Sequence, residues 1–291
     1  MPSLKDTKRR IGSVKSTQKI TRAMKLVSSA KFARANRAIL NARPYGEAFA
    51  NMVSLMVKGE EQSSPLLEKR DEKKTLLIIV SSDRGLCGGL NSNLFKDVGR
   101  FLSERSQKGV QTDLILWGKR SCMYGSKRPE TSLSKEEKVL DKPDYGFVAR
   151  HTTEFCRQFE AGEYDRVVVA YSHFQNAITQ KPTLKQLLPV EPHEDSGETS
   201  GDENGVSKEF LFEPEKQALV DQILRQQIAT DLYGILLNGA ASEHAARMTA
   251  MDNATNNADD VIRSLTLLYN RARQAAITKE LIEITSGADA L

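Results

Sequence analysis

The sequence predicts an α/β fold in which a small Rossmann-like domain lies between two long terminal helices that pair as an antiparallel coiled coil. Good helix formers fill the first 58 residues, short apolar runs alternate with helical patterns in the middle, and no proline follows Pro214 in the last 77 residues. A helix that spans most of the last 77 residues is much longer than a ~100-residue domain, whose radius of gyration is only ~13 Å. Such a helix must extend beyond the domain, and there it needs a partner. The helix at the other end of the chain is the obvious one.

The N-terminal helix is expected over residues 1–58. Ser3 and Asp6 have the spacing of a capping box at its start, and Pro44 is a position where it can kink. One face carries a weakly apolar stripe at steps of three and four residues, which predicts a coiled-coil seam. This stripe consists of Ile11, Val14, Gln18, Thr21, Met24 and Ser28.

The α/β domain is expected over residues 75–190, after a polar linker. Its short apolar runs are typical of buried strands, and the segments between them have helical patterns. The strands are expected at 76–80, 113–117 and 166–171, and the helices at 90–107 and 144–159. Strands that alternate with helices favour a parallel sheet. Residues 191–208 are acidic and turn-rich, so we expect a flexible surface loop there.

The last region, residues 209–291, is expected to be mostly one helix. If 216–286 is helical throughout, it is roughly 105 Å long, and Gly234 and Gly239 mark where it can bend. Its stripe is Met248, Met251, Thr255, Ala258, Ile262, Leu265, Leu268, Ala272 and Ala275. Both stripes are rich in Ala, Ser, Thr and Met where a self-sufficient coiled coil prefers Leu and Ile. We therefore expect a partner to sheathe the pair.

The charge of the chain is divided unevenly. Residues 1–43 carry twelve basic residues and one acidic residue, a net charge of +11, whereas the rest of the chain sums to −7. A basic helix of this kind predicts an anionic partner. From the residues alone, that partner is either nucleic acid or the acidic loops of another protein.

The sequence indicates no catalytic chemistry. Cys87, Cys122 and Cys156 are expected to be reduced thiols, no histidine pair has metal-ligand spacing, and no window reaches the ~18 apolar residues of a membrane span. The glycine-rich segment 81–91 lacks the order of a phosphate-binding loop, so a tight strand-to-helix turn is favoured. The alternative left open is a nucleotide-binding α/β protein whose basic arm binds nucleic acid.

Three segments resemble the gamma-subunit family of F-type ATP synthases. They are Ser16–Val27 (STQKITRAMKLV), Ser82–Asn91 (SDRGLCGGLN) and Ser242–Ala290, which contains Ala-Arg-Met-x-Ala-Met and Tyr-Asn-x-x-Arg-Gln-Ala-x-Ile-Thr. The resemblance covers essentially the whole chain in the order of the family.

The resemblance implies a non-catalytic central rotor shaft. Its terminal helices would turn inside a ring of three alpha and three beta subunits, and its globular part would stand with epsilon on the membrane ring of c subunits. The family implies no cofactor, no metal, no nucleic acid and no membrane contact except through the complex. A bacterial member would lie at the cytoplasmic face of the inner membrane. The cysteine-bearing regulatory insert of chloroplast members is absent, so thiol switching is not expected.

The resemblance also implies three groups of contact residues. Those expected to face the catch loops of the beta subunits are Met24, Lys25, Arg273, Gln274 and Thr278. Those expected in the foot that faces the c ring are Phe210 and Glu213. Those expected at the shaft tip, in an apolar sleeve, are Ala288, Ala290 and Leu291.

Overall fold

The computed structural model describes residues 3–57, 64–128, 130, 132–191 and 216–288. Its contacts divide the chain into two compact units, residues 1–30 with 247–291 and residues 31–246. Two long helices, α1 (Leu4–Val57) and α5 (Lys216–Ala288), each contribute to both units. The predicted fold class is therefore confirmed. The predicted domains keep each terminal helix whole, whereas the compact units divide both helices, at residues 30/31 and 246/247. The predicted boundaries remain a proposal.

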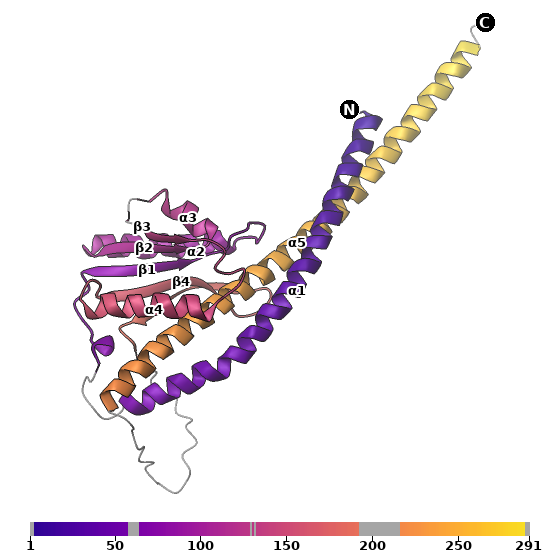
Figure 1. The fold of residues 1–291 in the computed structure, drawn as a ribbon. Helices are drawn as coiled ribbons and strands as arrows, with labels where there is room; N and C mark the ends of the chain where they lie inside the picture. Colours follow the sequence, from indigo (N-terminus) through magenta and orange to yellow (C-terminus); the bar gives the residue numbers. More distant parts are fainter. Residues whose placement is uncertain (1–2, 58–63, 129, 131, 192–215, 289–291) are drawn as a thin grey trace, which may run out of the picture. The chain divides into compact units, whose positions relative to one another are not determined.

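The larger unit is built on a five-stranded sheet with strand order β3-β2-β1-β4-β5 (Figure 1). In chain order its elements between the two long helices are η1 (Pro65–Leu67), β1 (Lys74–Val80), α2 (Leu90–Gln107), β2 (Gln111–Trp117), α3 (Lys119–Gly125), β3 (Ser132–Glu136), α4 (Tyr145–Glu160), β4 (Arg166–Phe174) and β5 (Gln180–Leu188). The three predicted strands and two predicted helices are all present. Strands β3 and β5 and helix α3 were not predicted.

The prediction of a wholly parallel sheet is wrong at one edge. Strands β1 to β4 pair in parallel, but β5 pairs antiparallel with β4. The connection, residues 175–179, is too short for the crossover that parallel neighbours require. The side chain of Asn176 fixes this turn, because its Oδ1 accepts hydrogen bonds from the N–H groups of Ile178 and Thr179 at 3.0 and 2.7 Å.

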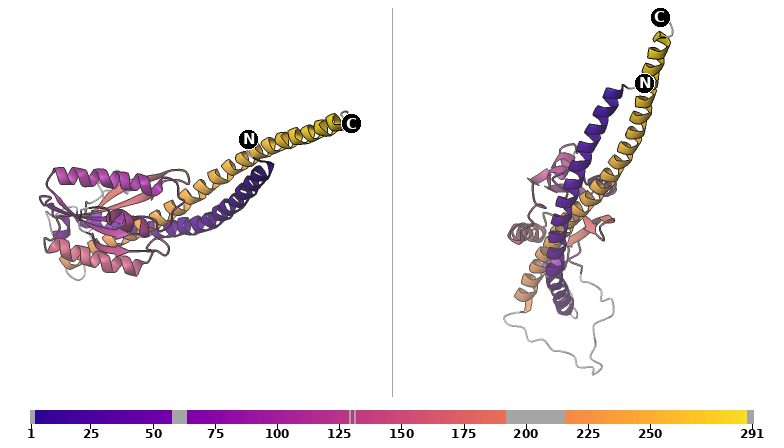
Figure 2. Two further views of the ribbon diagram at one scale, coloured as in Figure 1. Left: turned by 90° about the horizontal axis from the view of Figure 1, so that it is seen from above. Right: turned by 90° about the vertical axis from the view of Figure 1, so that its right-hand side faces the viewer.

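Alternate side chains of the central strands form two hydrophobic cores, one on each face of the sheet. On β1, Leu76 and Ile78 belong to the core that includes α4 and residues of α5, whereas Leu77 and Ile79 pack with α2. Figure 2 shows α2 and α4 on opposite sides of the sheet. Because both faces are covered, the strands read as continuous apolar runs, which is why the sequence revealed them.

Helix α5 runs without interruption through both glycines at which a bend was expected. Gly239 has a packing role instead. A Cβ atom placed there would lie 3.2 Å from Cδ2 of Leu140, which is 3% exposed in the core beside α5. Glycine therefore allows the helix to approach this core closely.

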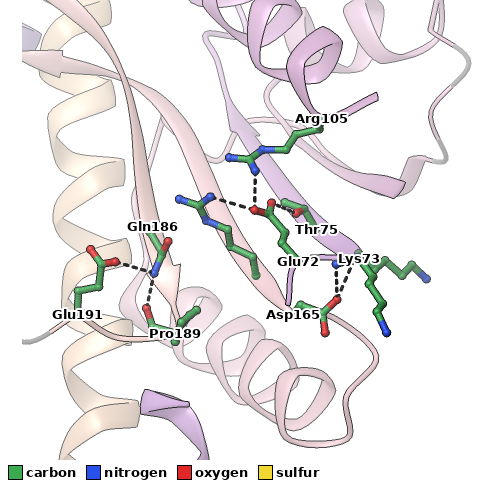
Figure 3. A network of polar contacts seen from close by, with 10 residues as sticks. Glu72, Lys73, Thr75, Arg105, Asp165, Gln186, Pro189 and Glu191 are labelled. Carbon is green, nitrogen blue, oxygen red and sulfur yellow. Dashed lines mark hydrogen bonds and ion pairs between the residues drawn. The ribbon is translucent and has the colours of Figure 1, made fainter. Parts of the chain in front are cut away.

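A network of charged groups ties the start of β1 to its neighbours (Figure 3). The carboxylate of Glu72 accepts hydrogen bonds from Thr75 Oγ1 at 2.6 Å, from Arg166 at 3.3 Å and from Arg105 of α2. The side chains of Glu72 and Arg105 are only 20% and 15% exposed. One carboxylate thus neutralises two arginines that are largely withdrawn from water.

We expect Glu72→Gln to lower the free energy of unfolding by about 2 kcal/mol, because two partly buried guanidinium groups lose their counter-charge. Urea unfolding followed by tryptophan fluorescence measures the change. The matched control is Glu154→Gln, whose partner Arg157 is on the surface of the same helix. Breaking that exposed pair is expected to change stability by less than about 0.5 kcal/mol. Equal losses in the two variants would contradict the assignment.

Candidate partner-contact surface on the helix pair

The smaller unit pairs the first part of α1 with the last part of α5, side by side in both Figure 1 and Figure 2. Three cross-helix contacts set the register: Gln18 with Asp259, Thr21 with Thr255, and Lys25 with Asp252. Residue numbers fall on α5 as they rise on α1, so the helices are antiparallel, as predicted.

All three of these contacts are polar. The hydroxyl oxygens of Thr21 and Thr255 lie 2.8 Å apart, and Lys25 Nζ donates to Asp252 Oδ1 at 2.6 Å. Polar pairs at a coiled-coil seam fix register at the expense of stability. These contacts therefore specify the register of the two helices, beside the apolar members of the two stripes.

The predicted stripe on α1 is confirmed, because each of its members is buried or half-buried. The stripe predicted on α5 is wrong at two positions. Leu268 is 47% exposed and Ala275 is also exposed, whereas Tyr269 and Ala276 are half-buried in their place. A heptad seam alternates steps of three and four residues. The predicted stripe takes a step of four from Ala258 to Ile262 and then two successive steps of three, so from Leu268 onward it falls one residue short.

Large apolar side chains are exposed on both helices, along the paired region and on α5 beyond the start of α1. In this unit, those that are 44–66% exposed are Ile20, Leu26, Val27, Val261, Leu267, Leu268, Ile277, Leu281 and Ile282. Scattered exposed leucines are ordinary on a protein surface, but this number on two helices is not. The outer surface is therefore suited to burial against another molecule.

The same surface carries unneutralised positive charge on α1. Within the described part of the chain, no ion pair involves Lys5, Lys8, Arg10, Lys15 or Lys19. The side chains of all five are exposed. An apolar surface with a cationic side fits an acidic protein partner.

The predicted contact residues are divided between two environments. Met24 and Lys25 are half-buried, and the charge of Lys25 is matched by Asp252 within the chain. Arg273, Gln274 and Thr278 are all exposed. From the seam contacts, the start of α1 lies opposite about residue 273 of α5. These three residues therefore lie where α5 passes the end of its partner helix.

The remaining predicted contact residues cannot be placed in the same way. Phe210, Glu213, Ala290 and Leu291 lie outside the described residues, as does the predicted acidic loop from residue 192 onward. Ala288 is the last residue of α5, and its side chain is not described.

Sequence reasoning missed Asp252 and Asp259 as seam residues. The available signal was Gln18 and Thr21, two polar residues inside the predicted stripe of α1, which require polar partners on the facing helix. The register that decides which α5 residues face them is a tertiary property.

The glycine-rich turn is held by its own side chains. Asn91 accepts the N–H of Ser82 and donates to Ser82 Oγ at 2.8 Å and to Cys87 Sγ at 3.3 Å. Gly88 and Leu86 have φ of 58° and 61°, so the turn does use the left-handed region. These contacts explain the motif as a tight turn between β1 and α2.

The described residues offer no conventional chemical centre. Among them, no group of three or more His, Cys, Asp or Glu is placed to hold a metal ion, and no helix is long and apolar enough to cross a bilayer. All three cysteines are free, and burial raises the pKa of Cys156 to about 12, so its thiol stays protonated at neutral pH.

Comparisons with known proteins agree over the full chain. The family model for ATP synthase matches residues 3–291. An ATP synthase gamma chain of Geobacter sp. (strain M21) is 43% identical, and one of Trichlorobacter lovleyi is 44% identical; both alignments cover 100% of this chain and 99% of the relative.

Solved structures give the same result. The central stalk and c-ring structure of the Tetrahymena thermophila mitochondrial ATP synthase contains a chain that is 27% identical, with a TM-score of 0.59, over 81% of this chain and 99% of that one. A Euglena gracilis mitochondrial ATP synthase chain reaches a TM-score of 0.68 at 20% identity, over 99% and 94% of the two chains, and supports the fold.

The polar seam leads to a prediction about the helix pair. Thr21→Val together with Thr255→Val replaces two facing hydroxyls by methyl groups of the same shape. We expect the pair to gain about 1 kcal/mol, because a joint apolar replacement leaves no unpaired partner. Trypsin cleavage after Lys15 and Lys19, which requires local opening, should slow roughly fivefold. Thr17→Val, an exposed position on the same helix, is the control. Faster cleavage of the double variant would contradict the prediction.

Proposed function

The chain belongs to the ATP synthase gamma-chain family, and from that premise we propose that its helix pair is the shaft that transmits rotation to the catalytic sites of an F-type ATP synthase. It is the non-catalytic central-stalk subunit. Membership of this family gives no support to the alternative of a nucleotide-binding protein with a nucleic-acid-binding arm.

One observation carries the proposal: the helix pair is held in register by polar contacts, and it exposes large apolar side chains together with cations of α1 that no described residue pairs. The seam gives alignment, and the outer surface gives the interaction with a surrounding protein. A ring of three alpha and three beta subunits provides the enclosure that such a surface needs. Acidic loops on those subunits would neutralise the cations of α1.

The coupling follows from asymmetry. Two antiparallel helices present different side chains in different directions, so each surrounding beta subunit meets a different face at a given angle. A ligand or partner shifts a conformational equilibrium only by its differential affinity for the two states. As the shaft turns, these contacts favour one state in one beta subunit and another state in the next. No bond chemistry is required of the shaft itself.

The contact residues divide by role within this proposal. Arg273, Gln274 and Thr278 are exposed near the end of the paired region and can donate hydrogen bonds to a beta catch loop. Met24 and Lys25 are proposed to approach acidic beta loops, with Asp252 sharing the ammonium. The tight contact with Asp252 fixes where that charge is held.

The remaining contacts belong to the two ends of the rotor. We place Phe210 and Glu213 at the foot that faces the c ring, next to epsilon, and Ala288, Ala290 and Leu291 at the tip within the alpha and beta ring. The protein is then a peripheral component at the cytoplasmic face of a bacterial inner membrane, held there only through the complex.

The proposal is tested by affinity purification of the tagged chain from solubilised membranes, with identification of the bound proteins. We expect alpha, beta, epsilon and c subunits in one complex that hydrolyses ATP, while the isolated chain does not. Recovery of nucleic acid, or ATP turnover by the isolated chain, would contradict it.

The exposed α5 residues give a sharper prediction. Arg273→Ala with Gln274→Ala removes the proposed donors to the catch loop, and we expect the ATPase rate of the assembled complex to fall roughly tenfold, as for a loss of about 1.4 kcal/mol. Arg271→Ala removes another exposed cation from a different face of the same helix and serves as the control. An unchanged rate in the double variant, or equal losses in both, would refute the assignment.

A further inference from the structure

One part of α5, residues 239–246, passes the place where a doubly wound sheet ordinarily binds its ligand. The chain goes from β1 outward to β2 and β3 and then returns to β4 on the other side of β1, so the strand order reverses between β1 and β4. In open parallel sheets, ligands bind outside the carboxyl ends of the strands at such a reversal, next to the turn that follows β1. Here that turn packs on α5 instead, because Cys87, Leu90 and Ala246 form one buried cluster.

Two further contacts hold this part of α5 to the larger unit. The hydroxyl of Ser242, which is fully buried, donates a hydrogen bond to the carbonyl oxygen of Ser172 on β4 at 2.8 Å. A Cβ atom added to Gly239 would lie 3.2 Å from Leu140 and 3.7 Å from Val80, the last residue of β1. Positions 239, 242 and 246 are three and four residues apart and therefore share one face of the helix. Contacts along one face fix the rotation of α5 about its own axis.

Helix α1 is held at the same edge of the sheet. The ring of Phe32 packs on the ring of Phe174, the last residue of β4, with the two centroids 5.3 Å apart. Lys31 Nζ lies 3.9 Å from Oδ1 of Asp141, which belongs to the connection between β3 and α4. Strand β4 therefore contacts α5 through Ser172 and α1 through Phe174.

These contacts lie where both long helices leave the larger unit. That unit begins at residue 31 on α1 and ends at residue 246 on α5, so the chain passes between the two units only through these helices. Both helices continue without interruption beyond these positions (Figure 1). Closely packed protein interiors have low compressibility and transmit strain. Torque carried by the chain from one unit to the other must therefore pass through the helices at this point.

We propose that Phe32 of α1 and Gly239, Ser242 and Ala246 of α5 form a collar that locks both helices to the sheet, so that the shaft turns with the larger unit and does not slip in it. These are positioning residues for coupling, and they act without contact to a beta subunit. The proposal rests on the proposed function, because it takes the larger unit to be the part that the c ring drives.

Gly239→Val tests the collar in the assembled complex. Its side chain would press on Leu140 and move α5 away from the sheet. In inverted membrane vesicles, ATP hydrolysis is measured together with the transmembrane potential that it generates, which a potential-sensitive dye reports. We expect an unchanged rate of hydrolysis and a roughly threefold lower potential per ATP hydrolysed, because overpacking loosens the contact and lets the shaft slip. Gly234→Val is the matched control, since a Cβ atom added there has open space around it among the described residues.

A second substitution serves as rescue. Leu140→Ala removes the side chain that the valine meets, so Gly239→Val together with Leu140→Ala should recover most of the lost potential, as expected for two residues in contact. Absence of recovery would contradict the assigned contact.

Ser242→Ala tests the collar without adding volume, and it remains informative if Gly239→Val does not assemble. It removes the hydrogen bond to Ser172, and we expect the potential per ATP hydrolysed to fall about twofold. Thr230→Ala is the control, because the hydroxyl of Thr230 bonds within α5 to the carbonyl oxygen of Gln226 at 2.8 Å.

Three results would overturn the proposal: an unchanged potential per ATP in both test variants, a parallel fall of hydrolysis and potential, or an equal effect of Gly234→Val. A parallel fall would show a general loss of structure, which lowers both quantities. Any of these results in a complex that still contains the alpha, beta, epsilon and c subunits leaves the rotor assignment intact. Failure of the unaltered chain to co-purify with those subunits would instead overturn that assignment.

Discussion

Two helices packed against each other share only one seam, and in this chain that seam combines a few apolar side chains, such as Ile11, Val14, Ile262 and Leu265, with small and polar ones. Threonine faces threonine, and a lysine and a glutamine each meet an aspartate, while other isoleucines, leucines and valines are exposed. The hydrophobic effect, the largest favourable contribution to folding, is therefore only partly used between the two helices, and another molecule would be needed to bury the exposed apolar side chains. This constraint links the composition of the terminal helices to the place of the chain inside a larger assembly.

The larger unit has the opposite character. Its sheet is covered on both faces, with Trp117 and Phe159 fully buried, and its strand starts are tied by a shared carboxylate. Both of its hydrophobic cores are formed by residues of the unit itself. A rotor needs a rigid body and a shaft with an exposed contact surface. The rigid body receives torque, and the shaft exchanges contacts with successive neighbours. The polar seam then keeps the two helices in one register while the surrounding contacts change.

The sequence was informative where burial is two-sided or strongly periodic. Helix α2 has the predicted bounds, Leu90–Gln107, because its leucines and valine repeat on one face. The missed strands β3 and β5 are at the edges, where side chains are half-exposed and the apolar run that marks a buried strand does not arise. The wrong assignment of Leu268 to the seam has a related cause. Leu268 and Tyr269 both satisfy an apolar pattern, and only the facing helix decides which of them is buried. The paired aspartates of the seam depend on the same register.

The central claim is that the helix pair is completed by its surroundings, and amide hydrogen exchange over residues 5–28 tests it most directly. The isolated full-length chain and the assembled complex would be compared by mass spectrometry under identical conditions. If partner subunits supply the stabilisation, these amides should exchange at least about 100-fold more slowly in the complex, a gain of roughly 2.7 kcal/mol in local stability. Equal protection in the two states would show that the pair is stable by itself and would contradict the claim.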